Sequence, residues 1–186
     1  MSEPIRILYV HGYLGSGNGH SSRLIQQEFA LRGVPCELDA PDFPVTKPEE
    51  MKKQINHLID GKRYDYIVAS SLGAFYCMQI SGIQKILVNI ALPENLERIK
   101  ESDPGQHPGL TAKFFAEINK EKEAFFSEIL DANFIQETYV IYGTKDSIAS
   151  NEKFLRRYYT DGSRVFHIDM EHKLDENGAS TVFNII

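Results

Sequence analysis

Two adjacent serines, Ser70 and Ser71, stand between a short apolar run and a glycine in the segment IVASSLGAFYC (67–77). A serine becomes a nucleophile when it lies on a sharp strand-to-helix turn, and this turn requires small residues two positions before and after the serine. Ala69 and Gly73 meet that requirement around Ser71, whereas bulky side chains flank Ser70 at the same spacing. The spacing favours Ser71 as the nucleophile, although serines also cap helices and the motif alone leaves both interpretations open.

A serine nucleophile needs a histidine base and an acid that orients the base, and in one large class of serine enzymes the acid and then the histidine follow the serine in the chain. Asp146 follows a predicted strand in YGTKDS, and His172 follows the next predicted strand in DMEHKLDE. Neighbouring loops would bring them together, so that His172 takes the proton of Ser71 while Asp146 fixes the tautomer. Asp169 and Glu171 are alternative acids, but they share a segment with His172, whereas the usual acid comes from the neighbouring loop.

The glycine-rich segment HGYLGSG (11–17) follows the first predicted strand. In such enzymes a turn at this place supplies a backbone N–H to the oxyanion of the reaction intermediate, and here the donor would be Tyr13. The N–H of Leu72, at the start of the helix after the serine, would be the second donor. We expect His11 to form hydrogen bonds within its loop, and Tyr13, Leu14 and Leu72 to lie near any substrate.

Short apolar runs alternate with helical patterns along the chain, which predicts a parallel sheet covered by helices on both faces. The predicted strands span residues 5–10, 35–41, 64–70, 85–92, 137–143 and 163–169. Helices are predicted over residues 22–32, in the segment that ends at residue 61, over 72–80 and 151–158, and at the end of the chain. Thr46 and Glu49 have the spacing of a capping box for the second helix, with Pro48 in its first turn.

Residues 93–132 break this alternation with a loop and a long phenylalanine-rich helical pattern. A lid over an active site commonly enters between the fourth and fifth strands, so we expect a small lid or insertion here. Phe114 and Phe115 are candidates for binding an apolar acyl group. At least half of the phenylalanines of the segment are expected to pack in the core instead.

The chain resembles α/β-hydrolases, specifically the short bacterial YqiA-like esterases, in five segments that span most of its length in the expected order: LYVHGYLGS, VASSLGAFYC, ILVNIAL, YGTKD and EHKL. The resemblance implies a three-layer α/β-hydrolase fold with a trimmed, mainly parallel sheet of about six strands, which we expect in the order 2-1-3-4-5-6. It also implies a catalytic triad of Ser71, Asp146 and His172 that acts on short acyl esters. Ala69 stands where larger relatives have glycine, and NIAL replaces an Asn-Pro that often follows the fourth strand.

The length and composition fit one compact globular domain, and with the resemblance this implies a single α/β-hydrolase domain over residues 1–186. The net charge of −6 gives no electrostatic reason to expect nucleic acid or an anionic membrane as a partner. Cys36 and Cys77 are too few for a disulfide framework or a four-cysteine zinc site, and no apolar run reaches the length of a membrane span. We therefore expect a cytoplasmic protein that acts on a small-molecule ester or thioester without a metal or other cofactor. No pattern indicates an oligomeric state.

Two other interpretations use the same residues. A Rossmann-like protein could bind a nucleotide phosphate through the Gly12–Gly19 loop, with Asp39 as the acid on the ribose. The glycine spacing does not match G-x-G-x-x-G, no G-K-[ST] follows, and this interpretation leaves Ser71, Asp146 and His172 without a role. The chain could also be a non-catalytic binding module on a hydrolase scaffold, since fold and function separate readily.

Overall fold

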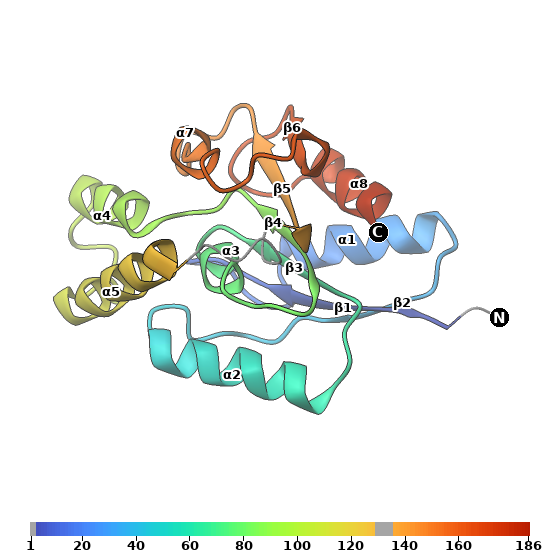
Figure 1. The fold of residues 1–186 in the computed structure, drawn as a ribbon, viewed down its shortest axis with the longest axis horizontal. Helices are drawn as coiled ribbons and strands as arrows, with labels where there is room; N and C mark the ends of the chain where they lie inside the picture. Colours follow the sequence, from blue (N-terminus) through green and yellow to red (C-terminus); the bar gives the residue numbers. More distant parts are fainter. Residues whose placement is uncertain (1–2, 129–135) are drawn as a thin grey trace.

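Six parallel strands pair in the order β2-β1-β3-β4-β5-β6 in the computed structural model, which describes residues 3–128 and 136–186 (Figure 1). The strands are β1 (Ile5–Val10), β2 (Cys36–Asp39), β3 (Tyr66–Ser70), β4 (Gln84–Val88), β5 (Thr138–Gly143) and β6 (Val165–Ile168). The predicted strand order is confirmed. β4 ends earlier than predicted, because Asn89 has a positive φ of 47° that leaves the extended conformation.

The helices lie between these strands, as the alternating pattern predicts. They are α1 (His20–Leu31), α2 (Pro48–Gly61), α3 (Leu72–Cys77), α4 (Pro93–Ser102), α5 (Ala112–Glu128), α7 (Glu152–Leu155) and α8 (Glu176–Ile185), with a 3-10 turn at Gly162–Arg164. No helix in the described part of the chain is long and apolar enough to cross a membrane.

Helix α2 does not begin with a capping box. Its N-cap residue is Lys47, which has φ −128° and ψ 86° and whose side chain does not cap the backbone N–H groups of the first turn. The predicted box would need Lys47 in a helical conformation, but the ring of a following proline disfavours that conformation. The prediction at Thr46 and Glu49 is therefore wrong, and Pro48 fixes the start of the helix.

Helices cover both faces of the sheet, because successive residues of a strand point to opposite faces. In β1, Ile7 and Tyr9 pack in one cluster with residues of α1 and α8. Leu8 and Val10 pack in a second cluster with residues of α2, α3 and α5. Figure 1 shows α1 and α8 side by side, and the two helices are in contact. The result is a three-layer structure, which confirms the predicted fold class.

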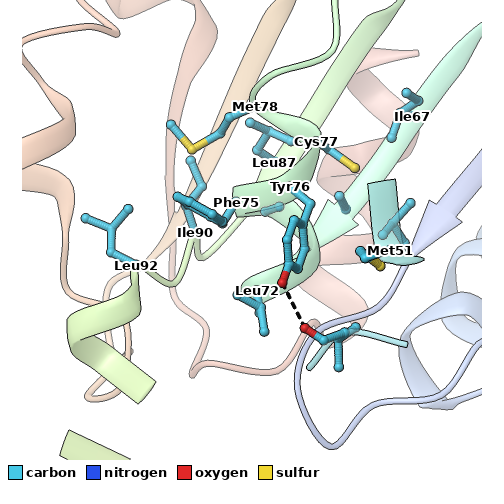
Figure 2. Close-up of a cluster of buried hydrophobic side chains, with 14 of the residues drawn as sticks. Met51, Ile67, Leu72, Phe75, Tyr76, Cys77, Met78, Leu87, Ile90 and Leu92 are labelled. Atoms are coloured by element: carbon cyan, nitrogen blue, oxygen red, sulfur yellow. Dashed lines mark hydrogen bonds between the residues drawn. The ribbon is translucent and has the colours of Figure 1, made fainter. Parts of the chain in front are cut away.

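Helix α3, which follows β3, is buried along its whole length. Figure 2 shows side chains of this helix, among them Phe75 and Tyr76, within the hydrophobic cluster. The Tyr76 hydroxyl donates to the carbonyl oxygen of Val45 at 2.9 Å, drawn as a dashed line in Figure 2. The helix ends at Cys77 and not at residue 80. The start of α3 is thus fixed firmly in the core.

The described part of the predicted lid segment, residues 93–128, forms α4 and α5, which pack against each other. α5 also packs on α2 and buries several of its apolar side chains. These buried residues are Phe114, Ile118 and Phe125. Residues 129–132 of the predicted segment lie outside the described residues, and the role of the segment as a lid stays a prediction.

Candidate active site

Ser71 lies on the turn between β3 and α3. Its backbone has φ 54° and ψ −123°, a conformation that residues other than glycine rarely adopt. The Ser71 N–H donates to the carbonyl oxygen of Val88 at 2.9 Å, and its carbonyl oxygen accepts from the N–H of Ala91 at 3.2 Å. Such strain persists only where the surrounding structure holds the backbone, and it concentrates at functional sites. The turn has the sharp geometry that a nucleophile at Ser71 requires.

Two glycines let the loop after β1 pack directly on this turn. A Cβ atom added to Gly12 would lie 2.6 Å from Cβ of Ser71. A Cβ atom added to Gly73 would lie 2.4 Å from the carbonyl oxygen of His11 and 2.6 Å from that of Val10. These distances are too short for any side chain. Glycine at both positions therefore brings the two loops into backbone contact beside Ser71.

His172 and Asp146 lie next to Ser71, on the loops that follow β6 and β5. Nε2 of His172 is 2.9 Å from Oγ of Ser71, and Nδ1 is 2.9 Å from Oδ2 of Asp146. Oδ1 of Asp146 accepts from the N–H groups of Ile148 and Ala149 at 2.7 and 3.0 Å. The side chain of Asp146 is 3% exposed and that of His172 is 17% exposed. The structure thus brings together the three residues that the sequence analysis selects.

These contacts determine where the protons lie. Burial alone would raise the pKa of the Asp146 carboxyl, but hydrogen bonds from His172 and from the N–H groups of Ala149 and Ile148 outweigh burial and lower that pKa. An ionised carboxylate only accepts hydrogen bonds, so Nδ1 of His172 carries a proton and donates it. In the neutral ring Nε2 then has no proton, and it accepts a hydrogen bond from the Ser71 hydroxyl.

The alternative acids do not take the place of Asp146. Asp169 forms an ion pair with Lys145 at 2.7 Å, and both side chains are exposed. No hydrogen bond joins the Glu171 side chain to His172 among the residues that the structure describes. Asp146 is therefore the carboxylate that contacts the imidazole.

Asn89, directly after β4, ties the loops of this site together. The side chain is buried, and its Oδ1 accepts from the N–H of Gly143 at 2.7 Å. Its Nδ2 donates to the carbonyl oxygens of Glu171 and His172, each at 2.9 Å. The amide thus joins the end of β5 to the backbone of His172. Sequence analysis missed this residue, although a single polar side chain within the apolar run ILVNIAL was a usable signal.

The two predicted oxyanion donors differ in how they are held. Leu72 is the first residue of α3, so its N–H has no acceptor within the helix, and its side chain is buried in the core. The carbonyl oxygen of Gly12 accepts from Nδ1 of His11 at 2.9 Å and from the N–H of Gly15 at 3.0 Å. The Gly12 C=O and the Tyr13 N–H belong to the same trans peptide and point in opposite directions. The Tyr13 N–H therefore points away from His11 and Gly15. Within the described residues, neither donor N–H has a protein acceptor.

His11 has a structural role in this loop. Its Nε2 accepts from the N–H of Phe43 at 2.9 Å, while Nδ1 donates to the carbonyl oxygen of Gly12. The ring is buried and both nitrogens are occupied. The expectation that His11 forms hydrogen bonds within its loop is confirmed, and these bonds fix the orientation of the Gly12–Tyr13 peptide.

A cavity of about 360 Å³ opens beside Ser71 and His172. Leu14, a predicted substrate contact, lines it and is 76% exposed. Phe114 and Phe115 are not among the residues that line it in the described part of the chain. Phe114 is buried and Phe115 packs against the same core, because α5 turns this face towards its neighbouring helices. Three further aliphatic lining residues come from α4 and the loop after β5: Leu96, Ile99 and Ile148.

The arrangement is suited to acyl transfer. A hydroxyl that is hydrogen-bonded to an oriented imidazole can attack a carbonyl carbon, and free N–H groups can stabilise the resulting oxyanion. Within residues 3–128 and 136–186, no group of three or more His, Cys, Asp or Glu side chains is placed to hold a metal ion.

A sequence model of a family described as "Uncharacterised protein family (UPF0227)" matches residues 6–179. No curated protein matches the chain. Among solved structures, the ydeN gene product from B. subtilis is similar, with a TM-score of 0.60 and 16% identity over 97% of this chain and 96% of that chain.

Two further solved structures have the same architecture. An extracellular α/β-hydrolase from a Paenibacillus species has a TM-score of 0.59 and 12% identity over 98% of this chain and 97% of that chain. A structure of the metagenome-derived lipolytic enzymes LipS and LipT has a TM-score of 0.54 and 13% identity over 90% and 85% of the two chains. These likenesses establish the α/β-hydrolase fold.

Proposed function

Because the chain belongs to the uncharacterised protein family UPF0227 and has the α/β-hydrolase fold, we propose that it is a serine hydrolase of small acyl esters or thioesters. In this proposal Ser71 is the nucleophile, His172 the general base and acid, and Asp146 the residue that orients His172. The observation that carries it is the unbroken hydrogen-bonded series from Asp146 through His172 to Ser71 on a strained turn.

The first half of the reaction forms an acyl-enzyme. Oγ of Ser71 attacks the carbonyl carbon while its proton passes to Nε2 of His172, and the nearby Asp146 carboxylate stabilises the imidazolium. The carbonyl oxygen becomes an oxyanion that accepts hydrogen bonds from the N–H groups of Tyr13 and Leu72. As the tetrahedral intermediate collapses, the bond to the leaving oxygen or sulfur breaks, and the leaving group takes the proton from His172.

The second half releases the acid. Water enters beside the acyl-enzyme, gives a proton to Nε2 of His172 and attacks the carbonyl carbon. The oxyanion forms again in the same place, and its collapse returns the proton to Oγ of Ser71. Loss of one oxyanion donor costs on the order of 10²–10³ in kcat where this has been measured in a protease.

Nucleotide binding by the Gly12–Gly19 loop has less support. Gly12 is needed for the contact with Ser71, which gives that glycine a role without any phosphate. The carboxylate of Asp39 accepts hydrogen bonds from Lys62 at 2.9 Å and Tyr64 at 2.7 Å, so both donors compete with a ribose for it.

The proposal is tested by comparing hydrolysis of p-nitrophenyl butyrate and a butyryl thioester by the wild type and by Ser71→Ala. We expect the variant to lose activity by a factor on the order of 10⁴–10⁶, with an unchanged melting temperature. A folded wild type that hydrolyses neither compound would contradict the proposal. If nucleotides stabilised such a protein, nucleotide binding would be favoured. A protein that neither hydrolyses the two compounds nor responds to nucleotides would favour a non-catalytic binding module.

A further inference from the structure

Among the residues that line the cavity beside Ser71, two groups differ in their chemistry. One group presents hydroxyl and imidazole groups: Tyr9, His20, Ser21 and Ser70. The other presents aliphatic side chains: Leu96, Ile99 and Ile148. We call them the hydroxyl wall and the aliphatic wall. Within the described residues the lining contains no carboxylate.

The two walls lie on opposite faces of the sheet. Tyr9 packs in the cluster between the sheet and α1 and α8, and this cluster also holds Leu174, two residues after His172. Leu96 belongs to the cluster on the other face, and Ile99 packs against that cluster. The hydroxyl wall and His172 therefore share one side of the nucleophile, and the aliphatic wall occupies the other.

The proposed chemistry decides which half of a substrate meets which wall. The leaving oxygen takes its proton from Nε2 of His172, so the alcohol half must lie on the side of His172. The acyl half is bonded to Oγ of Ser71 and extends away from the leaving group. The alcohol thus faces the hydroxyl wall, and the acyl chain faces the aliphatic wall.

The hydroxyl groups of Tyr9 and Ser70 in the hydroxyl wall are held in place by burial and hydrogen bonds. Tyr9 is 2% exposed, and its hydroxyl is 3.0 Å from Oγ of Ser70, with Ser21 as a further hydrogen-bond partner. Burial raises the pKa of Tyr9, so its hydroxyl stays protonated and can both donate and accept. Each hydroxyl has one proton and two lone pairs, so Tyr9 with two partners and Ser70 with one both keep capacity for a ligand. A purely apolar alcohol would leave that capacity unused.

Resting on the proposed serine hydrolase function, we infer that the preferred substrate is a short-chain ester of a polyol. Free hydroxyl groups of its alcohol half bind Tyr9 and Ser70, and its acyl chain packs on Leu96 and Ile99. The cavity volume of about 360 Å³ is near the lower end for ligand sites, which fits a small acyl chain.

The test compares glycerol monobutyrate with propyl butyrate, which have the same acyl group and the same three-carbon alcohol skeleton. We expect the wild type to prefer the glycerol ester in kcat/KM by at least about tenfold. Tyr9→Phe and Ser70→Ala should each reduce this preference by about tenfold, because each removes one hydrogen-bonding group. Ile99→Ala is the control for the other wall, and it should lower kcat/KM for both esters in equal proportion.

Equal kcat/KM for the two esters in the wild type, or a preference that survives in both hydroxyl-wall variants, would overturn the inference. Labelling of each variant by a fluorophosphonate separates this outcome from a failure of the proposed function. A wild type that is labelled on Ser71 but shows no preference overturns only the substrate class. A folded wild type that is not labelled overturns the serine hydrolase function, and the substrate class falls with it.

Discussion

Ser71 is held by close backbone packing, whereas His172 is held by the side chain of an asparagine 83 residues away in the chain. On the nucleophile side, Gly12 and Gly73 leave no room for a Cβ atom, and the loop after β1 lies directly against the turn. On this side of the site, the absence of a side chain at the two glycines allows the close packing.

The acid–base side is defined by side chains that are present. Asn89 connects Gly143 to the backbone of His172 through three hydrogen bonds. A second buried amide, Asn95, donates to the carbonyl oxygen of Ile148 in the loop that follows Asp146. Each amide connects segments that are far apart in the sequence.

The two halves of the site should therefore respond differently to mutation. Adding one methyl group should disrupt the nucleophile side through steric overlap, which lowers stability together with activity. Removing one amide or one charge on the acid–base side should leave the turn at Ser71 in place and lower the rate of the chemical step.

Outside the nucleophile itself, the largest effect is expected from Asp146→Asn. The amide keeps the shape of the carboxylate but no longer holds the required tautomer of His172, so kcat should fall by a factor on the order of 10⁴. Steady-state kinetics on p-nitrophenyl butyrate measure this effect. Asp169→Asn is the control, because Asp169 pairs with exposed Lys145 and not with His172. A similar loss of activity in both variants would contradict the assignment of Asp146.

The next effect is expected from Asn89→Gly. Glycine accepts the positive φ of this position, so the variant removes the amide without adding backbone strain. Displacement of His172 should lower kcat by a factor on the order of 10² and change KM little. Asn95→Ala is the comparison variant. Both variants should lower the free energy of unfolding by about 1–3 kcal/mol, but Asn95→Ala should lower kcat less than Asn89→Gly. Equal losses of kcat in the two variants would show that Asn89 supports the fold without positioning His172.

On the nucleophile side, Gly73→Ala should lower the free energy of unfolding by about 1–3 kcal/mol, since its Cβ would lie 2.4 Å from a backbone oxygen of the packed loop. Gly61→Ala is the matched control, because nothing lies within 4 Å of a Cβ atom at that residue. Urea unfolding of both variants measures the difference. A Gly73→Ala protein as stable as Gly61→Ala would contradict the close packing on which this side of the comparison depends.

The smallest effect is a pH dependence of stability on the acid–base side. The pKa of Asp146 is lower in the folded protein than its ordinary value of 3.8, so the native state binds fewer protons than the unfolded state near that pH. The stabilisation by its carboxylate is therefore present above about pH 4 and lost as the pH falls through the folded pKa. The stability difference between wild type and Asp146→Asn should shrink from pH 7 to pH 3, and a constant difference in urea unfolding would contradict it.

Much of the fold follows from the sequence alone. Apolar runs alternating with helical patterns predict a parallel sheet, and the carboxyl ends of such strands meet at one edge. This geometry explains why the proximity of Ser71, Asp146 and His172 is predictable from three loop positions. The role of Gly73 is also predictable from the sequence, because a sharp turn before a buried helix has no room for a side chain and therefore requires glycine.

The remaining features depend on contacts that no local pattern records. Asn89 falls inside an apolar run, and its partners lie in β5 and the loop after β6. The direction in which α5 turns Phe114 depends on its packing against α2, and the aliphatic wall comes from α4 and the loop after β5 instead. The capping-box prediction at Thr46 failed because a proline two residues later controls the backbone before it.

Activation of Ser71 is tested most directly by the intact mass of the protein after reaction with a fluorophosphonate, which modifies serines activated by a histidine base. We predict one adduct per chain on the wild type and on Ser70→Ala, and none on Ser71→Ala. The neighbouring serine is a demanding control, since only Ser71 contacts His172, at 2.9 Å. An unmodified, folded wild type, or an adduct that persists on Ser71→Ala, would contradict the central claim that Ser71 is an activated nucleophile.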